Sequence, residues 1–346
     1  MSRALVLATN GTVRLEDRAV PNLVDGEVRV QVIATGICGS DVHGAAGDTG
    51  RRVSGQVMGH ETVGRVIDVG AEEDAGLLGV IAAIDPVVSC GECARCRHGE
   101  HQHCETGWVL GVRPDKDGAF ATEVVVPNRN VVPLPESMTP WHGALIEPLA
   151  VGYHAAIRGS VSESDRVLVL GGGPIGQAVA LACARLGARR VVVSEPRENR
   201  GTLLESLGFV HSTPDELEGA VHREFGAGAT VVFDVVGTDG TLATAITHST
   251  ALARIVLVGM DSPRICLDAY AVSAGERALI GTICSTREHF RDTAVWAAQN
   301  PGILDRLVDR RERLEYGARV FAELLAGTAN ANKVLLFTDS DSLGVQ

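Results

Sequence analysis

A chain of 346 residues is long enough for about two domains, and its hydrophobic fraction of 45% provides for a sizeable core. A net charge of −12 disfavours nucleic acid as a partner, because a phosphate backbone calls for a basic surface. No apolar run reaches the roughly 18 residues that a membrane span needs, and the first residues lack the apolar stretch of a signal peptide. We therefore expect a cytoplasmic protein with no membrane or nucleic-acid partner.

The first third of the chain alternates short β-like runs with Gly and Pro, which is typical of a β-rich domain. The clearest runs are residues 28–32, 63–69 and 121–126. Prolines then mark a connecting stretch, at Pro127, Pro133, Pro135 and Pro140.

One short segment of this first part is rich in thiols, with Cys90, Cys93, Cys96 and Cys104. Four thiolates give Zn²⁺ a closed tetrahedral shell, which is the signature of a structural site. We expect residues 86–108 to form a zinc lobe. The histidines inside it are alternative ligands, but the simpler interpretation leaves them solvated, namely His98, His101 and His103. Three other cysteines lie in apolar surroundings and are expected to be buried, namely Cys183, Cys266 and Cys284.

The sequence pattern changes from about residue 165, where predicted apolar strands alternate with predicted helices. The predicted strands are residues 167–170, 191–193, 231–235, 254–258 and 278–283, and the predicted helices are residues 175–186 and 198–207. Strands that alternate with helices predict an α/β domain with a doubly wound parallel sheet.

The turn after the first of these strands fits the dinucleotide pattern G-x-G-x-x-G, with Gly171, Gly173, Pro174, Ile175 and Gly176. Glycines there allow a tight turn, close approach of a pyrophosphate and close packing of helix and strand, while the helix N-terminus faces the phosphates. Glu195 ends the next strand, at about the sequence separation from the glycine turn that is expected for a carboxylate that binds the adenosine ribose. This carboxylate favours NAD, although Arg197 and Arg200 follow it and leave NADP open.

A second set of chemically active residues lies outside the thiol-rich segment. Cys38 and His60 offer sulfur and nitrogen, and either Glu61 or Glu147 offers oxygen. A catalytic zinc needs about three protein ligands and one open position. A single Cys or His of this kind is more often a packed or solvated residue than a metal ligand. The occurrence of all of them together predicts a catalytic zinc site.

These motifs together resemble the zinc-containing medium-chain dehydrogenase/reductase family, and most of all its polyol, butanediol and threonine dehydrogenase branch. The similarity rests on residues 36–41, 59–61, the four-cysteine lobe, 118–121, 147–150 and the glycine turn before Glu195. It implies a GroES-like β-barrel catalytic domain at 1–150, a Rossmann cofactor domain at 151–284, and a C-terminal segment, 285–346, that returns to the first domain. It also implies a homo-oligomer, a dimer or a homotetramer.

The resemblance assigns roles to individual positions. Cys38 and His60 match zinc ligands, Glu147 matches the third ligand, and Glu61 matches a glutamate that exchanges with it in some members. Asp41 matches the carboxylate that orients the zinc-bound histidine, while Ser40 and His43 match a proton relay. Alcohol dehydrogenases often carry a cation where this chain has Gly39, so we hypothesise that Lys333 contacts the pyrophosphate instead.

The expected protein is an enzyme with two Zn²⁺ per chain, which moves a hydride between a secondary alcohol or polyol and NAD. One alternative is a biosynthetic ketone reductase for a sugar or aminocyclitol, with NADP(H) left open. For this alternative, a polar loop near the site would contact a hydroxyl-rich or charged substrate, through Thr49, Arg51 and Arg52. A more distant alternative is a non-catalytic dinucleotide-binding protein stabilised by zinc.

Overall fold

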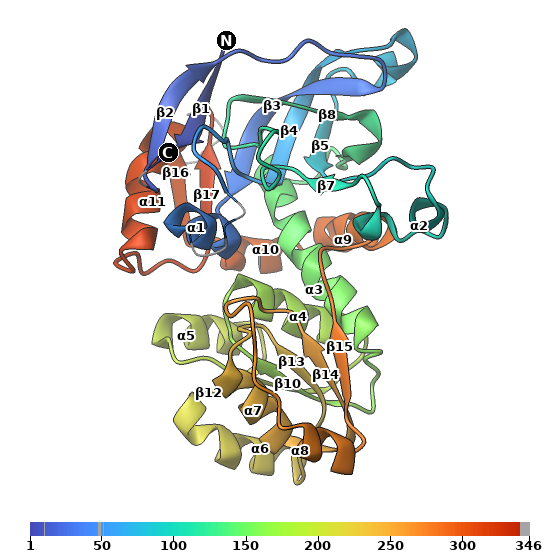
Figure 1. Cartoon of the computed structure of the whole chain (residues 1–346), viewed down its shortest axis with the longest axis vertical. Coiled ribbons are helices and arrows are strands. Elements are labelled where there is room, and N and C mark those ends of the chain that lie inside the picture. The colour runs from blue at the N-terminus through green and yellow to red at the C-terminus, as the bar shows by residue number, and fades with distance from the viewer. Residues whose placement is uncertain (10, 48–49, 51, 340–346) are drawn as a thin grey trace. The chain divides into compact units, whose positions relative to one another are not determined.

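The computed structural model describes residues 1–9, 11–47, 50 and 52–339, and it divides into two compact units (Figure 1). The first unit combines Met1–Glu147 with Thr286–Gln346, and the second is Pro148–Ser285. The C-terminal segment thus packs with the first part of the chain. Among the described residues, no helix is both long enough and apolar enough to cross a membrane.

Strands dominate the first unit, as the Gly- and Pro-punctuated sequence predicts. Its main sheet has seven strands, which are antiparallel except for one parallel pair, β16 and β17. The order along that sheet is β16 (Arg310–Arg313), β17 (Val334–Phe337), β3 (Glu27–Gly36), β4 (Glu61–Val69), β5 (Ile81–Ile84) and β9 (Val131–Pro133), with β8 (Glu123–Pro127) paired to β3. Two smaller sheets pair β1 (Ser2–Leu7) with β2 (Val13–Arg18) and β6 (Val87–Val88) with β7 (Trp108–Val109).

Short helices connect these strands. They are α1 (Gly39–Ala46), α2 (Ala94–Arg97), α9 (Arg287–Gln299), α10 (Pro301–Leu307) and α11 (Gly317–Leu325), with 3₁₀ turns η1 (Glu72–Leu77), η2 (His101–His103), η3 (Asn128–Asn130), η4 (Pro140–Leu145) and η6 (Leu314–Tyr316). Helix α3 (Ile146–Arg158) begins at the end of the first unit and continues into the second. The first unit has two buried hydrophobic clusters. One is formed by side chains of β1, α11 and β17 among others, and the other mainly by side chains of β3, β4, β5, β8 and β9.

The second unit contains a six-stranded sheet in which every pairing is parallel. Its order is β12 (Val210–Ser212), β11 (Arg190–Ser194), β10 (Arg166–Leu170), β13 (Ala229–Asp234), β14 (Ser249–Leu257) and β15 (Ala278–Gly281). The helices are α4 (Pro174–Arg185), α5 (Glu198–Ser206), α6 (Leu217–Phe225), α7 (Asp239–Thr247) and α8 (Ala269–Ala274), with the 3₁₀ turn η5 (Pro214–Glu216). The chain leaves β10 in one direction and later returns to its other side, so the predicted doubly wound sheet is confirmed.

Both faces of this sheet are buried. Along β10, Val167 and Val169 pack with side chains of α3, α4 and α5, whereas Leu168 and Leu170 pack with those of α6 and α7. Helices therefore cover both faces (Figure 1). This burial explains why the strands are continuous apolar runs rather than alternating ones.

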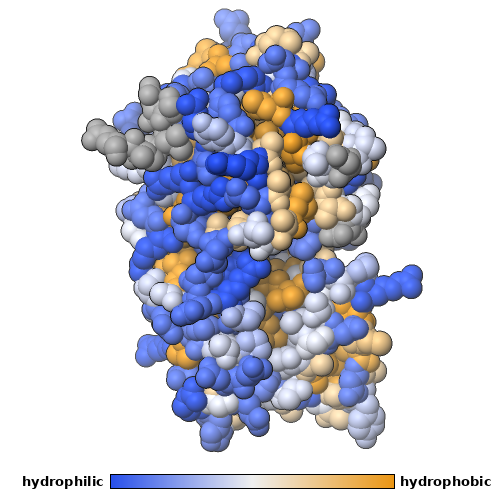
Figure 2. Space-filling view, turned by 90° about the vertical axis from the view of Figure 1, so that its left-hand side faces the viewer, coloured by the Kyte–Doolittle hydropathy of each residue, from blue (hydrophilic) through white to orange (hydrophobic). Residues whose placement is uncertain are grey.

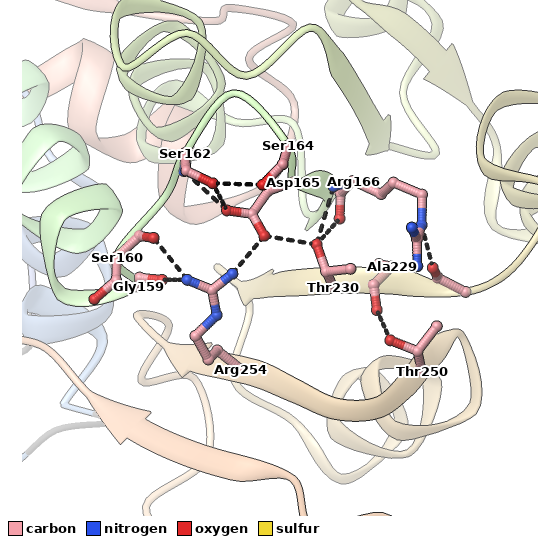
Figure 3. Close-up of polar contacts among 11 residues, drawn as sticks. Gly159, Ser160, Ser162, Ser164, Asp165, Arg166, Ala229, Thr230, Thr250 and Arg254 are labelled. Carbon is pink, nitrogen blue, oxygen red and sulfur yellow. Dashed lines mark hydrogen bonds and ion pairs between the residues drawn. The ribbon is translucent and has the colours of Figure 1, made fainter.

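A polar network fastens β10, β13 and β14 at the edge where their strands begin (Figure 3). Asp165 lies at its centre: its Oδ2 accepts hydrogen bonds from Ser162 N and Ser162 Oγ at 2.8 and 2.9 Å, and its Oδ1 accepts one from Thr230 Oγ1 at 2.8 Å. Arg254 forms an ion pair with Asp165, and its Nη1 donates to Gly159 O and Ser160 O. Burial alone would raise the pKa of Asp165. The hydrogen bonds from Thr230 and Ser162 and the charge of Arg254 together have the larger effect, so the pKa of Asp165 is lowered.

The sequence predicts that three cysteines outside the zinc lobe are buried, and the structure confirms this for one of them. Cys183 is buried as expected, but Cys266 is exposed and Cys284 is only partly buried. Cys266 lies in the loop before α8, where its backbone N–H donates to Asp239 Oδ1, so apolar neighbours in sequence did not imply burial.

Figure 2 shows that hydrophilic side chains predominate on one face of the molecule, with apolar ones in small groups.

Candidate metal and cofactor sites

Two groups of metal-ligating side chains occur among the described residues, and both lie in the first unit. One contains Cys38, His60 and Glu61, and the other contains the four cysteines of the predicted lobe. Within each group, one potential ligand atom per residue lies within 4.8 Å of all the others. Cys38 is far from His60 and Glu61 in the sequence, whereas the four cysteines lie in one short segment. In both cases the fold brings the potential ligand atoms together.

Strand register explains the first group. Strand β3 pairs with β4 so that Gly36 lies opposite Glu61, and Cys38 follows Gly36 at the start of α1. His60 immediately precedes β4. A sulfur, an imidazole and a carboxylate therefore meet at one end of a strand pair, which is a donor set suited to zinc.

Asp41 stands behind this group and is completely buried. Its Oδ1 lies 3.5 Å from His60 Nδ1, and its Oδ2 accepts a hydrogen bond from Cys38 N at 3.3 Å. Burial alone would raise the pKa of Asp41, but the facing His60 and Arg52 have the larger effect and the pKa is lowered. Burial alone would lower the pKa of His60, but Asp41 raises it well above its ordinary value. With Nδ1 turned to Asp41, the other ring nitrogen of His60 is left for a metal.

Lys333 joins the same group from the position just before β17, a strand that pairs with β3 on the side opposite β4. Its ammonium forms an ion pair with Glu61 and donates to Ile37 O at 3.2 Å, and the side chains of Lys333 and Glu61 are 3% and 1% exposed. Burial would lower the pKa of Lys333, but Glu61 and Cys38 raise it. A Cβ at Gly36 would lie 2.0 Å from Glu61 Oε2, so only glycine leaves space for this pair.

This arrangement bears on the hypothesis that Lys333 contacts the cofactor pyrophosphate. The ammonium is buried and engaged by Glu61 in the metal-binding group, so the geometry gives it a different partner from the one that we expected. An ammonium in contact with a buried carboxylate balances its charge. Contact between Lys333 and the pyrophosphate stays a prediction.

Glu147 lies in the first turn of α3 and is not in the group whose atoms lie within 4.8 Å, although it is close enough to interact with His60, Glu61 and Lys333. Burial raises its pKa to about 7, helped by the negative charge of Glu61. The spacing thus favours Glu61 over Glu147 as the oxygen donor nearest Cys38 and His60. The sequence alone had left that choice open.

The two residues expected to relay protons, Ser40 and His43, are both on α1 and both exposed. They are three residues apart, so they share one face of the helix. The polar loop that we expected to contact substrate is different. Thr49 and Arg51 lie outside the described residues, and the Arg52 side chain is only 3% exposed, in contact with Asp41. A side chain buried in this way is not available to a substrate, so the expectation that Arg52 contacts substrate is wrong.

The second group, the four cysteines, forms a compact cluster around α2. Cys90 Sγ lies 3.5 Å from Cys104 Sγ, and Cys93 Sγ lies 3.5 Å from Cys96 Sγ. A hydrogen bond from Cys90 N is the main reason why the pKa of Cys104 falls to about 6, which favours the thiolate that a metal needs. All four are free thiols, and the cluster has the composition of a closed zinc site.

One histidine of the lobe is not solvated as expected. His101 is 3% exposed, its Nδ1 accepts a hydrogen bond from Arg287 N at 3.1 Å, and its Nε2 lies 3.5 Å from Asp85 Oδ2. It therefore connects the lobe to the start of α9. Sequence reasoning missed this role because Arg287 is far away in the chain.

In the second unit, the glycine turn follows β10 at the point where the strand order reverses. Gly171 has a φ of +99°, and a Cβ at Gly176 would lie 1.8 Å from Gly171 O, so both positions need glycine. Gly173 precedes α4, whose first two residues are Pro174 and Ile175.

Glu195, at the end of β11, is 3% exposed and connects the glycine turn to the neighbouring strand. Its Oε2 accepts a hydrogen bond from Gly172 N and its Oε1 accepts one from Arg197 N, each at 2.9 Å. Arg200 lies beside it, with Nη1 3.7 Å from Glu195 Oε2. Since each carboxylate oxygen has two acceptor sites, ribose hydroxyls can still bind here.

Comparison with known families agrees with both parts of this description. Residues 24–136 match the model of the alcohol dehydrogenase GroES-like domain, and residues 174–299 match that of the zinc-binding dehydrogenase domain. The first match includes all three residues of the first metal-binding group and the four cysteines. The second match begins within the glycine turn.

Similar proteins act on polyols and sugar acids. The chain is 31% identical over 283 residues to L-idonate 5-dehydrogenase of Vitis vinifera, covering 78% of this chain and 76% of the relative. It is 34% identical over 260 residues to 2-dehydro-3-deoxy-L-galactonate 5-dehydrogenase of Pseudoalteromonas atlantica, covering 74% and 75%. Among crystal structures, the alcohol dehydrogenase rspB from Escherichia coli CFT073, complexed with NADH, superposes with a TM-score of 0.88 at 28% identity, covering 97% of this chain and 99% of that one.

Proposed function

Because this chain belongs to the zinc-binding alcohol dehydrogenase family and is an oxidoreductase, we propose that it moves a hydride between the secondary alcohol of a polyol or sugar acid and NAD. The observation that carries this proposal is the meeting of Cys38, His60 and Glu61 within 4.8 Å. The named relatives are dehydrogenases of the sugar acids L-idonate and 2-dehydro-3-deoxy-L-galactonate, which suggests a hydroxyl-rich substrate.

The residues present fit a catalytic zinc. Cys38, His60 and Glu61 supply three donors of the types that zinc accepts, and three protein ligands leave one coordination position for substrate. We propose Glu61 as the third ligand and place Glu147 next to it, with Lys333 balancing the charge of the two carboxylates. A second zinc would be structural and held by Cys90, Cys93, Cys96 and Cys104.

When bound, the catalytic zinc would supply Lewis-acid polarisation of the substrate oxygen. The chain itself has to orient the ligands and remove a proton. Asp41 would hold the His60 ring through Nδ1. The Ser40 hydroxyl would take up the alcohol proton and pass it to the imidazole of exposed His43, because imidazoles exchange protons readily near neutral pH.

The preference for NAD over NADP rests on Glu195. A 2′-phosphate on the adenosine ribose would lie beside a buried carboxylate, and bringing two negative charges together is unfavourable. Arg197 and Arg200 are the residues that would favour NADP, but Arg200 already faces Glu195. Gly171, Gly173, Pro174, Ile175 and Gly176 would receive the pyrophosphate at the N-terminus of α4.

We also propose that the chain forms a homo-oligomer, a dimer or a tetramer, in the cytoplasm. Among the described residues, strand β15 lies at the edge of its sheet and pairs with β14 alone, and the neighbouring side chains of Leu252 and Ile283 are 70% and 42% exposed. A bare strand edge with exposed apolar groups is suited to pairing with another chain. Light scattering during size-exclusion chromatography measures the oligomeric state directly.

The experiment that tests the proposed reaction is a substrate panel. Initial rates of NAD⁺ reduction are measured with vicinal diols, polyols, sugar acids, threonine and aminocyclitols, before and after chelation and after zinc is restored. Turnover of one hydroxyl-rich class that is lost with zinc and regained with it supports the proposal. If no alcohol is oxidised by zinc-loaded protein, but ketones are reduced with NADPH, the biosynthetic reductase is the better description. If no substrate turns over in either direction, a non-catalytic binding protein replaces both.

A further inference from the structure

Arg52 is the one arginine or lysine in contact with Asp41 among the described residues, and neither side chain reaches solvent: they are 3% and 0% exposed. Arg52 Nη2 donates to Asp41 Oδ1 at 3.2 Å, and Arg52 Nη1 donates to Val112 O at 3.4 Å. The guanidinium is therefore held at two points. The same Asp41 Oδ1 lies 3.5 Å from His60 Nδ1. A continuous row thus runs from Arg52 through Asp41 to the ring of His60.

The path of the Arg52 side chain is built into α1. A Cβ at Gly44 would lie 2.5 Å from Arg52 Cγ and 3.3 Å from its Nε. Gly44 is three residues after Asp41, so both lie on the same face of the helix. Glycine weakens a helix relative to alanine, and here it leaves the space through which Arg52 reaches the carboxylate.

We propose that Arg52 is a positioning residue for the catalytic metal, which acts on His60 through Asp41. Three groups contact the Asp41 carboxylate: the Cys38 backbone, the His60 ring and the Arg52 guanidinium. Without Arg52, the carboxylate loses its strongest and most rigid donor and is free to rotate away from Nδ1. The His60 ring then loses its fixed direction, and ring direction decides how well its other nitrogen meets a metal.

This inference rests on the proposed catalytic zinc site, and zinc binding tests it without any need for turnover. Metal-free protein is titrated with zinc against a chromophoric chelator, so that the four-cysteine site and the catalytic site report as two binding steps. The variant is Arg52→Met, which keeps an apolar stem but removes the guanidinium. The matched control is Arg65→Met, since Arg65 is an exposed arginine of the same unit that also donates to a backbone carbonyl, Gly79 O.

We expect Arg52→Met to weaken the catalytic site about tenfold, as removal of an outer partner of a ligand commonly does. The four-cysteine site and both sites of Arg65→Met should keep the wild-type affinity. Cobalt in place of zinc should show altered ligand-field bands in Arg52→Met. Arg52→Lys should restore only part of the affinity, because an ammonium cannot hold Asp41 and Val112 O together in the same geometry.

A double-mutant cycle separates positioning from general packing. If Arg52 acts through Asp41, then Arg52→Met has no further effect on zinc affinity in an Asp41→Asn background. Equal losses in both backgrounds would overturn the proposal, as would a wild-type affinity in Arg52→Met or a matched weakening of both zinc sites. If the wild-type chain binds only one equivalent of zinc, the proposed catalytic site itself is refuted, and that outcome is visible before any variant is made.

Discussion

The ion pair between Lys333 and Glu61 gives the sharpest prediction about stability. Both side chains are almost fully buried, so replacing Lys333 with methionine leaves Glu61 as an uncompensated carboxylate next to Cys38 and Glu147. Removal of one partner from a buried ion pair typically costs about 3–5 kcal/mol. We expect the metal-free Lys333→Met variant to lose free energy of unfolding in this range at neutral pH.

The loss should depend on zinc. Zinc brings positive charge to the same carboxylate, so the zinc-loaded variant should recover most of the lost stability.

Tryptophan fluorescence during urea unfolding is a suitable assay, because all three tryptophans, Trp108, Trp141 and Trp296, belong to the first unit. The control is Lys116→Met, which replaces the only other lysine, an exposed one whose cation–π contact with Trp108 contributes about 1 kcal/mol at most. Unchanged stability of metal-free Lys333→Met, together with a raised Michaelis constant for NAD, would refute this reasoning. That pair of results would return Lys333 to the pyrophosphate role.

Three other predictions concern single residues. Cys38→Ser should abolish turnover while the protein still retains the zinc of the four-cysteine lobe, which metal analysis measures; retained turnover would remove Cys38 from the site. Asp165→Asn should lower the stability of the second unit at neutral pH, because a lowered pKa means that the folded state holds the carboxylate in its ionised form. This contribution is complete above the ordinary carboxyl pKa of 3.8 and is lost as pH falls through the lowered pKa, so hydrogen exchange should show variant and wild type converging in acid. Glu195→Ala should reduce kcat/KM for NAD relative to NADP by roughly tenfold or more, since hydrogen bonds to a charged group contribute about 1.5–3 kcal/mol; an unchanged ratio would mean that Glu195 does not select the cofactor.

Much of the second unit could be predicted from sequence because its signals are local. Apolar runs predicted β10, β11, β13 and β14, and the glycine turn marked the start of α4 to within one residue. Helices α6 and α7 were not predicted. Both carry apolar side chains at helical spacing that pack on the sheet, so the sequence held a local signal that the prediction did not use. These side chains are Leu217, Ala220, Val221 and Phe225 in α6, and Leu242, Ala245 and Ile246 in α7.

The metal-binding groups show the limit of local signals more clearly. The four cysteines lie within one segment, so their spacing alone indicated a cluster. Residue types also indicated Cys38 and His60, but the choice between Glu61 and Glu147 depends on the register of β3 and β4, which no local pattern reveals. Lys333 lies just before β17, near the other end of the chain, and neither its partner nor its burial could be inferred from the sequence.

Arg52 was misassigned for a related reason. A polar residue in a glycine-rich loop is usually solvated, and only the folded chain shows that its stem passes Gly44 to meet a buried carboxylate. His101 differs from expectation in the same way, through a contact with a segment that follows the second unit. In both cases a long-range contact overrides the ordinary surface preference of the residue type.

The central claim, that zinc held by Cys38, His60 and Glu61 is required for hydride transfer, is tested most directly by adding zinc back to metal-free protein. NADH formation from a hydroxyl-rich substrate is followed as a function of zinc equivalents added. The four-thiolate site should fill first, so we predict almost no turnover during the first equivalent and a rise to full turnover during the second. Full turnover in protein that has been shown to contain no metal would contradict the account.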